Sequence, residues 1–317
     1  MTLAWSLKSV PLKFSIGDWT AFSVPLRLHS CSVRLADRAA PNPEPKPPAE
    51  PALQGATGYV IRALPVCNAL PTLTVNEGFI RYVTLQYGHC FIDLSIGMDR
   101  YREKFSAKTR STITRKVRKF QEHCGGELKL STFQSAESMA EFHRLARQVS
   151  IKTYQEQLLD AGIPDSPAFA QEMTHLAQRD EVRGFVLFHG EEPVSYLYCP
   201  AQDGALVYAY LGYDPRYMKL SVGTVLQWLA LERIFAEGRF SFFDFTEGQS
   251  DHKRLVAPHE VRCANVMFLK NSAWLSLLVR AHAWTDSLSS AAGAFAERWG
   301  VKSRLRRILR FGLVSTR

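Results

Sequence analysis

Residues 182–212, VRGFVLFHGEEPVSYLYCPAQDGALVYAYLG, carry the clearest fold signal in the chain. It holds three runs rich in β-branched and aromatic residues, which are typical of strands, at 182–189, 193–199 and 205–212. Only short polar turns separate these runs, with Gly190 in the first turn and Gly204 in the second. Such turns favour antiparallel neighbours, so we predict a three-stranded meander.

Regular elements are also expected on both sides of this meander. Upstream, apolar residues recur at helical spacing over 137–160, and a second helix is expected over 166–179. Downstream we expect a helix over 221–237 that stops at Gly238, followed by a strand over 239–245. A polar loop over 246–253 and a last strand over 264–269 come next. This order predicts a mixed α/β (α+β) fold with helices flanking a mostly antiparallel sheet.

The N-terminal part reads as strands followed by one basic helix. Strand-like runs at 12–35, 59–66 and 79–94 surround a proline-rich linker at 40–52. A helix is expected over 99–123, where two glycines follow it. It carries eight cations outside its apolar stripe, which are Arg102, Lys104, Lys108, Arg110, Arg115, Lys116, Arg118 and Lys119. Such a surface suits RNA, lipid headgroups or substrate phosphates, or it is simply a solvated face.

Composition narrows the class of protein and its partners. The chain has 317 residues, a net charge of +9 and an isoelectric point of 9.3. This charge suits an anionic partner such as nucleic acid, a membrane surface or a phosphorylated cofactor. The six cysteines have no CxxC or zinc-ligand spacing, so we expect free thiols, no metal and a reducing, cytoplasmic location. No apolar run is long enough for a transmembrane helix, and no signal peptide is expected.

The junction between the strand at 205–212 and the helix at 222–237 is the first candidate site. The opening N–H groups of a helix lack internal partners and carry the positive end of its dipole, which suits a phosphate. We therefore predict a cofactor-binding site whose members are Arg216, Ser221, Val222, Gly223 and Thr224. The alternative is an ordinary helix start with a glycine that serves packing.

A polar cluster after the next strand is the second candidate site. Acylation of an amine needs a base for the ammonium, donors for the oxyanion and an acid for the leaving thiolate. Asp244, Glu247 and His252 are candidate bases, and Lys253 is a candidate charge stabiliser. The alternative is a solvated acidic turn with a lysine as counter-ion.

Three tyrosines lie on or just past the central strand, at 208, 210 and 213. Tyr208 and Tyr210 are expected to share one face of the sheet. Tyr210 is a candidate catalytic residue because a phenol near the strand end is able to protonate a thiolate, and Tyr213 is a candidate substrate contact. Packing in the core is the alternative for at least two of the three.

The run YAYLGYDPRYMKLSVGTVLQWLALERIFAEGRFSFFDFTEGQSDHKRLVA, at residues 208–257, resembles a known family. It is similar to GNAT acetyltransferases linked to cellulose and exopolysaccharide biosynthesis, whose relatives include FemAB aminoacyltransferases and bacterial ceramide synthases. The run YREKFSAKTRSTITRKVRKF, at 101–120, resembles the basic helix that such proteins carry before the core. Together the resemblance covers roughly residues 80 to 270.

The resemblance implies a sheet whose strands splay apart to admit the pantetheine arm of acyl-CoA. It places the CoA pyrophosphate at Ser221 to Thr224 and the family's aspartate-glycine-lysine motif at Asp244, Gly248 and Lys253. The broad GNAT signature Arg/Gln-x-x-Gly-x-Gly/Ala is matched well only at Gly223, because Met218 and Ser221 stand at its first two conserved positions.

The resemblance further implies two GNAT-like halves in tandem. Residues 1–134 are then a degenerate half, 135–270 the catalytic domain and 271–317 a basic amphipathic tail. The implied function is an N-acyltransferase that moves an acyl group from acyl-CoA to a primary amine, with Arg110 and Arg115 as substrate contacts. The alternatives are a tRNA-dependent aminoacyl transferase and a non-catalytic adaptor that binds anionic lipid or nucleic acid.

The C-terminal region bears on the acceptor. The segment AWLSLLVRAHAWTDSL, at 273–288, is apolar and bears tryptophan, and a basic amphipathic helix is expected over WGVKSRLRRILRF, at 299–311. Such helices suit the headgroup region of an anionic membrane, which predicts peripheral attachment to the inner membrane and a lipid amine as acceptor. The resemblance to bacterial ceramide synthases implies that this amine is a sphingoid-type base. An amino sugar of a polysaccharide is the next acceptor, and a tail docked on the core is the alternative reading.

Overall fold

The computed structural model describes residues 4–16, 19–39, 42, 44–49, 52–76, 78–153, 156, 162–247, 253 and 256–298. The chain forms two compact units. Unit 1 comprises Met1–Gly88 and Val261–Arg317, and unit 2 comprises His89–Glu260. Strand β5 (Phe79–Asp93) passes from the first unit into the second at Gly88.

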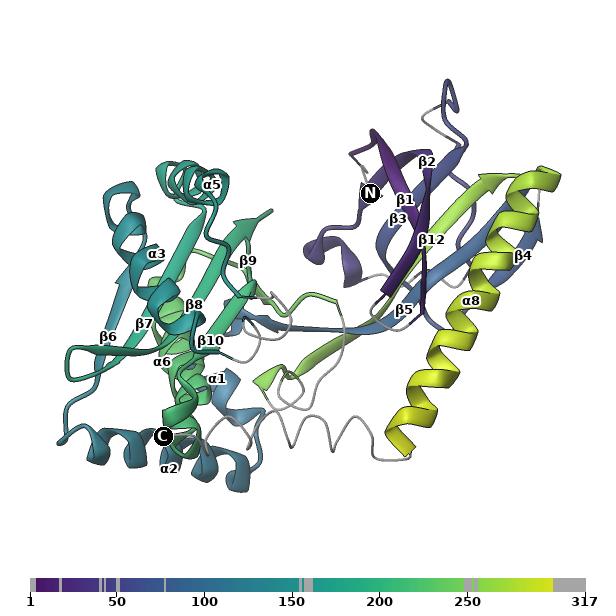
Figure 1. Ribbon diagram of the computed structural model, residues 1–317. Helices are drawn as coiled ribbons and strands as arrows, with labels where there is room; N and C mark the ends of the chain where they lie inside the picture. The colour runs from purple at the N-terminus through teal and green to yellow at the C-terminus, as the bar shows by residue number, and fades with distance from the viewer. Residues whose placement is uncertain are drawn as a thin grey trace. The chain divides into compact units, whose positions relative to one another are not determined.

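Unit 1 is a sheet with one long helix against it (Figure 1). Its strands follow the order β1-β2-β3-β12-β5, with β4 paired to β5. Their bounds are β1 Ser6–Ile16, β2 Trp19–Ser32, β3 Gly58–Pro65, β4 Leu73–Asn76 and β12 His259–Lys270. A short 3-10 helix, η1 (Leu35–Ala39), follows β2, and helix α8 (Ala273–Arg298) follows β12.

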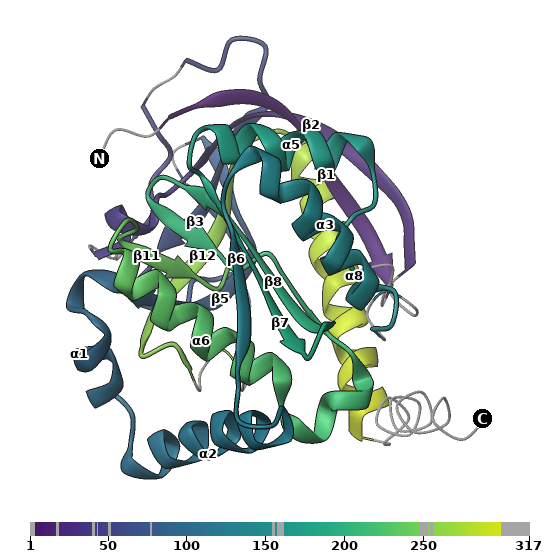
Figure 2. The same ribbon diagram turned by 90° about the vertical axis from the view of Figure 1, so that its left-hand side faces the viewer.

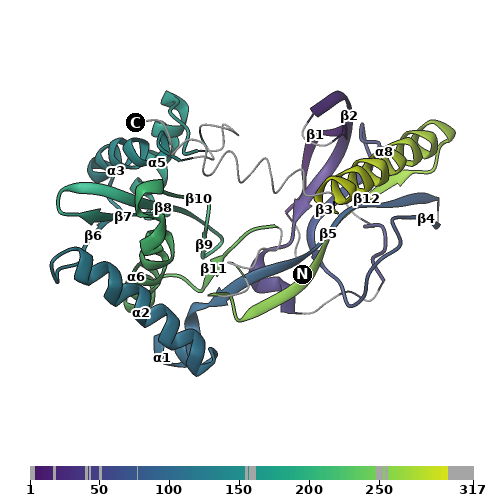
Figure 3. The ribbon, with the colours of Figure 1, turned by 60° about the horizontal axis from the view of Figure 1, so that its bottom comes forward.

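Helix α8 lies along β1 and closes one core of unit 1 (Figure 3). Leu275, Leu278 and Val279 are buried against apolar residues of the sheet because they recur at helical spacing on one side of α8. His282 lies on the same side of α8 and links the helix to β1, since its Nε2 lies 2.9 Å from the carbonyl oxygen of Lys13. The opposite side of α8 is therefore the one exposed to solvent.

Unit 2 contains a second run of strands, in the order β5-β11-β9-β8-β7-β6. The bounds are β6 Lys129–Phe133, β7 Val182–His189, β8 Glu192–Gln202, β9 Ala205–Val207, β10 Tyr210–Tyr213 and β11 Phe242–Asp244. Strand β9 pairs parallel with β11, and the other pairs are antiparallel. The predicted meander over 182–212 and the mixed, mostly antiparallel sheet flanked by helices are confirmed.

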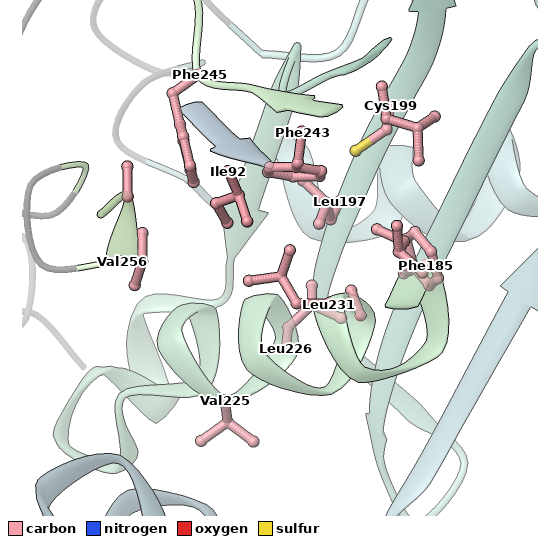
Figure 4. Close-up of a cluster of buried hydrophobic side chains, with 14 of the residues drawn as sticks. Ile92, Phe185, Leu197, Cys199, Val225, Leu226, Leu231, Phe243, Phe245 and Val256 are labelled. Atoms are coloured by element: carbon pink, nitrogen blue, oxygen red, sulfur yellow. The ribbon is translucent and has the colours of Figure 1, made fainter. Parts of the chain in front are cut away.

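Helices cover both faces of this sheet (Figure 2). Helices α3 and α5 pack on one face and α6 on the other, with α2 beside α6. Their bounds, with those of the smaller helices, are η2 Leu94–Ile96, α1 Met98–Glu103, α2 Ala107–His123, α3 Ala136–Ser150, α5 Pro167–Gln178, η3 Pro215–Leu220 and α6 Val222–Glu237. Figure 4 shows the core on the α6 side, where Leu226 and Leu231 face Leu197 and Phe243.

Two helix predictions were wrong in their bounds. The single basic helix expected over 99–123 is two helices, because the Ser106 hydroxyl accepts a hydrogen bond from the Thr109 N–H and starts α2 anew. The helix expected over 137–160 ends at Ser150, and the chain then turns at Thr153, whose hydroxyl donates to the Ser150 carbonyl.

The third strand of the meander is also broken, and this changes the placement of two tyrosines. The N–H of Tyr208 donates to the carbonyl of Asp244 at 2.8 Å, whereas the next N–H, of Ala209, donates to Tyr198. Tyr208 packs on the α6 side and Tyr210 on the α3–α5 side. The prediction that they share a face was wrong because the break between β9 and β10 shifts the alternation of side chains by one residue.

The two units do not follow the borders expected from the sequence. The structure divides at Gly88 and Glu260 by compactness, whereas residues 134 and 270 mark expected borders between related halves. Those halves stay a prediction. The expected tail helix over 299–311 lies outside the described residues, which end at Arg298, the last residue of α8.

Candidate functional site

Asp244 is the last residue of β11, and its side chain meets a histidine from the neighbouring strand. The Nε2 atom of His89, in β5, lies 2.6 Å from Asp244 Oδ1. Both side chains are shielded from water, with 3% and 13% of their surfaces exposed. Asp244 Oδ1 also accepts from the N–H of Thr246 at 2.7 Å. The carboxylate is thus held in one orientation while a proton-carrying partner touches it.

The register of β11 explains why these two side chains meet. Phe243 and Phe245 point into the core on the α6 side, so Asp244, between them, points to the opposite side of the sheet. In β5, Cys90 and Ile92 point into the same α6-side core, and His89 therefore lies on the Asp244 side. That is also the side of the sheet on which Tyr210 packs.

Lys253 lies close enough to Asp244 for the two charges to interact. Burial lowers the pKa of Lys253 because the ammonium loses hydration, while Cys90 and Asp244 oppose this shift. Its Nζ donates to the carbonyl oxygen of Glu247 at 3.0 Å. The structure therefore brings Asp244 and Lys253 together and leaves Glu247 exposed. His252 and Gly248 lie outside the described residues.

Backbone strain marks the loop that leaves this cluster. Thr246 has φ of 63°, in the left-handed region that a β-branched residue rarely adopts. Its N–H is the group that donates to Asp244. Strained residues of this kind persist where the surrounding structure holds them, and they gather at functional sites.

Next to this cluster, the sheet of unit 2 opens. Strands β9 and β11 pair over only three residues, with Asp244 opposite Val207 at the end of the pairing. Beyond the break, β10 pairs with β8 and with no other described strand. Among the described strands, Tyr210–Gly212 therefore has a partner on one edge, which agrees with the splayed sheet that the family resemblance implies.

Helix α6 begins directly after β10 and the short helix η3. Ser221 precedes the helix with φ of 55°, and its side chain makes no capping hydrogen bond. The N–H groups of Val222 and Gly223 donate to none of the described residues, whereas Thr224 N–H donates to the Ser221 carbonyl at 2.9 Å. Two orphan donors thus lie at the positive end of a 16-residue helix.

Gly223 also has the packing role that the sequence left open. A Cβ at this position would lie 3.3 Å from Leu211 Cδ2 and 3.3 Å from Tyr213 Cδ1. Both neighbours belong to β10, so glycine allows the first turn of α6 to approach that strand closely. Tyr213 therefore contacts the helix start rather than standing apart from it.

The cation next to the helix start is held by carboxylates. Arg216 makes ion pairs with Glu192 and, at 2.8 Å, with buried Asp214, and 62% of its side chain remains exposed. Burial alone would raise the pKa of Asp214, but hydrogen bonds from Arg216 and Lys152 hold it below its usual value. Arg216 therefore fixes the loop before α6 and keeps its outer surface in solvent.

The basic helix α2 supplies further cations at this end of α6. Lys119 Nζ donates to the carbonyl oxygen of Lys219 at 3.3 Å, which brings two exposed lysines together. Neither forms an ion pair with any residue in the described part of the chain. Arg115 is exposed, whereas Arg110 donates to the carbonyl oxygen of Phe105 at 3.1 Å and so joins α2 to the segment before it.

A comparison with known families bears on this arrangement. Residues 107–254 match the family described as "Acetyltransferase (GNAT) domain". The protein is an N-acyltransferase enzyme. Its GNAT domain spans α2 to the loop that carries Lys253, and GNAT domains use acyl-CoA as donor. No curated protein matches the sequence.

Several solved structures are similar to this chain at low sequence identity. The C-terminal domain (DUF2156) of a putative lysylphosphatidylglycerol synthetase from Agrobacterium fabrum is 10% identical, with 72% of this chain and 73% of that chain covered and a TM-score of 0.46. FemX is 10% identical, with 86% of this chain and 90% of that chain covered and a TM-score of 0.47. L-PGS from Bacillus licheniformis is 14% identical, with 71% of this chain and 72% of that chain covered and a TM-score of 0.44.

The described residues also bear on metal sites, disulfides and membrane-spanning helices. Among the described residues, no group of three or more His, Cys, Asp or Glu side chains is placed to hold a metal ion. The six cysteines are free thiols, as expected from their spacing. No helix within the described ranges is long and apolar enough to cross a membrane.

His89 is the residue of this site that sequence reasoning missed. It stands inside a strand-like run, and only the pairing of Phe91 with Asp244 brings its strand beside β11. The two positions are 155 residues apart along the chain. No local pattern signals such a contact.

Replacing Ser221 with glycine in the GNAT domain is expected to raise the free energy of unfolding by about 1 kcal/mol, because a left-handed backbone costs an L-residue roughly that much. Ser221 holds φ 55° without a capping bond that glycine would forfeit. Chemical denaturation of Ser221→Gly beside wild type measures the difference. A lower stability for Ser221→Gly would show that the hydroxyl has a role that the described contacts do not include.

Proposed function

We propose that the GNAT domain moves an acyl group from acyl-CoA to the nitrogen of a primary amine, and that a lipid amine is the preferred acceptor. The amine attacks the thioester carbonyl, and the tetrahedral intermediate then expels the CoA thiolate. The amine must first lose the proton of its ammonium form, and the thiolate must gain one. The observation that carries the proposal is the opening of the sheet between Asp244 and the start of α6.

Each end of this opening offers one part of the chemistry. Strand β10 pairs with β8 alone among the described strands, so the backbone of Tyr210–Gly212 suits the amide groups of a pantetheine arm, which are able to pair with it as an added strand. The orphan N–H groups of Val222 and Gly223 suit the pyrophosphate. Lys119 and Lys219 add positive charge close to that helix start.

The paired side chains of His89 and Asp244 are the proposed proton acceptor. Their contact of 2.6 Å lets the carboxylate orient the imidazole and stabilise its charged form. Tyr210 is the proposed acid for the thiolate, because it lies on the same side of the sheet as Asp244. Lys253 lies close to Asp244, and burial lowers the pKa of its side chain, which favours the neutral form of the lysine.

Mass spectrometry of the products tests this function. The full chain is incubated with palmitoyl-CoA or acetyl-CoA and with a sphingoid base, glucosamine or no acceptor. We expect an amide product and free CoA, most with the sphingoid base. Hydrolysis of acyl-CoA without any amide, or no consumption of either donor, would contradict the proposal.

The exposed side of α8 supports a lipid acceptor. Trp274, Leu277, Trp284 and Leu288 form one stripe along this helix, with exposed fractions of 63%, 63%, 66% and 48%. Tryptophan is enriched at membrane interfaces, and residues 298–317 add seven Lys and Arg residues to the sequence after this stripe. The stripe is the proposed contact with an anionic bilayer.

Changing both tryptophans of the stripe to serine is expected to weaken binding to anionic vesicles at least tenfold, because burying one large apolar side chain contributes roughly 1.5–3 kcal/mol. Sedimentation with phosphatidylglycerol vesicles measures the Trp274→Ser/Trp284→Ser variant, a chain shortened to residue 297 and the wild type. Leu85→Ser is the matched control, since Leu85 is 42% exposed on β5. Equal binding of wild type and double variant would remove the stripe from the proposal.

A tRNA-dependent aminoacyl transfer is the second candidate, and the exposed cations of α2 favour it. Arg115 and Lys119 present charge that suits a polyanionic donor as well as a nucleotide. Aminoacyl-tRNA is therefore a further donor in the same assay. Amide formation with aminoacyl-tRNA and none with acyl-CoA would replace the first proposal by this one.

A further inference from the structure

Arg81 of β5 is a buried arginine in unit 1 that has no carboxylate partner among the described residues. Only 7% of its surface is exposed. Its Nη1 donates to the Pro45 carbonyl oxygen at 3.4 Å, and its Nη2 donates to Thr74 Oγ1 at 3.2 Å. Its Nε is buried and has no hydrogen-bond partner. Two of the five N–H groups of the guanidinium thus have an acceptor among the described residues, and the Nε–H has none there.

An arrangement of this kind is costly unless an anion completes it. A guanidinium stays protonated at any ordinary pH, so burial cannot be relieved by loss of a proton. An unpaired buried charge forfeits its hydration without recovering it elsewhere. The buried Arg183 of unit 2 shows the usual solution, because it has both Asp180 and Glu237 as partners.

A cavity lies against Arg81. Its volume is about 160 Å³, and its lining includes Pro45, Lys46, Phe79 and Phe268. A cavity of about 150 Å³ holds a molecule the size of benzene, so this one admits a small organic acid. The two phenylalanine rings offer an apolar wall, and the guanidinium offers a polar one.

The charges of the lining favour a monoanion. Arg81 and Lys46 contribute two positive charges and exposed Glu44 one negative charge, which leaves +1 for a ligand to balance. A carboxylate has that charge and accepts two parallel hydrogen bonds from a guanidinium edge. A phosphate carries more charge and gains nothing from the aromatic wall.

We propose that this cavity of unit 1 binds a small monocarboxylate, whose oxygens pair with the Nη groups of Arg81 and whose apolar part lies against Phe79 and Phe268. The ligand class is an aromatic or short aliphatic acid. The lining of this cavity contains none of the residues proposed for acyl transfer, so the two proposals are tested independently.

Thermal unfolding and calorimetry of the full chain test the site, with benzoate, butyrate and inorganic phosphate as probes at constant ionic strength. We expect saturable binding of benzoate and butyrate, with a melting temperature that rises with their concentration. Phosphate should bind at least tenfold more weakly than benzoate. No saturable binding of either acid would overturn the proposal, and so would tighter binding of phosphate.

Variants locate the binding. Arg81→Met should weaken benzoate binding at least tenfold. The matched control is Arg38→Met, because Arg38 is equally buried at 7% and also has an unpaired nitrogen, yet does not line the cavity. Glu44→Gln changes an exposed residue and should tighten binding, since it removes a competing carboxylate. Unchanged affinity in Arg81→Met, or weaker binding in Glu44→Gln, would place the ligand elsewhere.

Discussion

Replacing Asp244 with asparagine is expected to lower kcat by roughly 10²–10⁴, the contribution of a positioned general base or its partner. Asparagine keeps the size of the side chain and its bond to Thr246, but it cannot stabilise a protonated His89. Donor affinity should remain within about twofold of wild type, because the change leaves the start of α6 untouched. Steady-state kinetics and calorimetry with CoA measure the two quantities separately.

Asp93→Asn is the matched control for this variant. Asp93 ends β5 beside β11, opposite Phe242, and its side chain accepts hydrogen bonds from the N–H and the hydroxyl of Ser95. We expect near-normal kcat for it. His89→Gln should resemble Asp244→Asn, and Glu247→Ala and His252→Ala test the remaining candidates. Near-normal kcat in Asp244→Asn, His89→Gln and Lys253→Ala together would refute the proposed assignment.

Replacing Gly223 with leucine is expected to weaken CoA binding at least tenfold. Its Cβ would already press on Leu211 and Tyr213 at 3.3 Å, and the rest of the side chain has to push β10 away from the first turn of α6. The orphan N–H groups then move away from the position that a pyrophosphate needs. Calorimetry with CoA measures this effect without an acceptor, and Gly223→Ala should fall between leucine and wild type.

Two further measurements separate a lost site from a lost fold. Ala236→Leu places the same side chain on an exposed position in the last turn of α6, and we expect its CoA affinity to equal that of wild type. The melting temperature of each variant shows whether the chain remains folded. A folded Gly223→Leu variant with unaltered CoA affinity would show that the helix start is not the donor site.

The breaks in regular structure lie at the candidate site, and their cause is tertiary. Residues 205–212 alternate and read as one strand, but Tyr208 bonds to Asp244 and Ala209 bonds to Tyr198. The run is divided into β9 and β10 because its backbone hydrogen-bonds to β11 on one side of the break and to β8 on the other. An isolated sequence pattern contains no information about that competition.

The sequence by itself determined the local elements. The period of apolar residues and the short glycine turns predicted the meander, and glycine at 238 predicted the end of α6, because both depend on neighbours within a few residues. It also predicted that Asp244 and Lys253 lie near each other, since only a short loop separates them. The sequence likewise showed the basic residues of α2, but the prediction of one continuous helix did not include the new start at Ser106.

Contacts between residues far apart in the chain depend on the tertiary structure. His89 joins Asp244 through the pairing of β5 with β11, and Lys119 reaches Lys219 through the packing of α2 beside α6. The same holds for the open edge of β10 and the buried Arg81. These features depend on strand register and on burial between segments far apart in the chain, and a one-residue shift in register moves a side chain to the other face of a sheet. Local sequence patterns do not encode that choice.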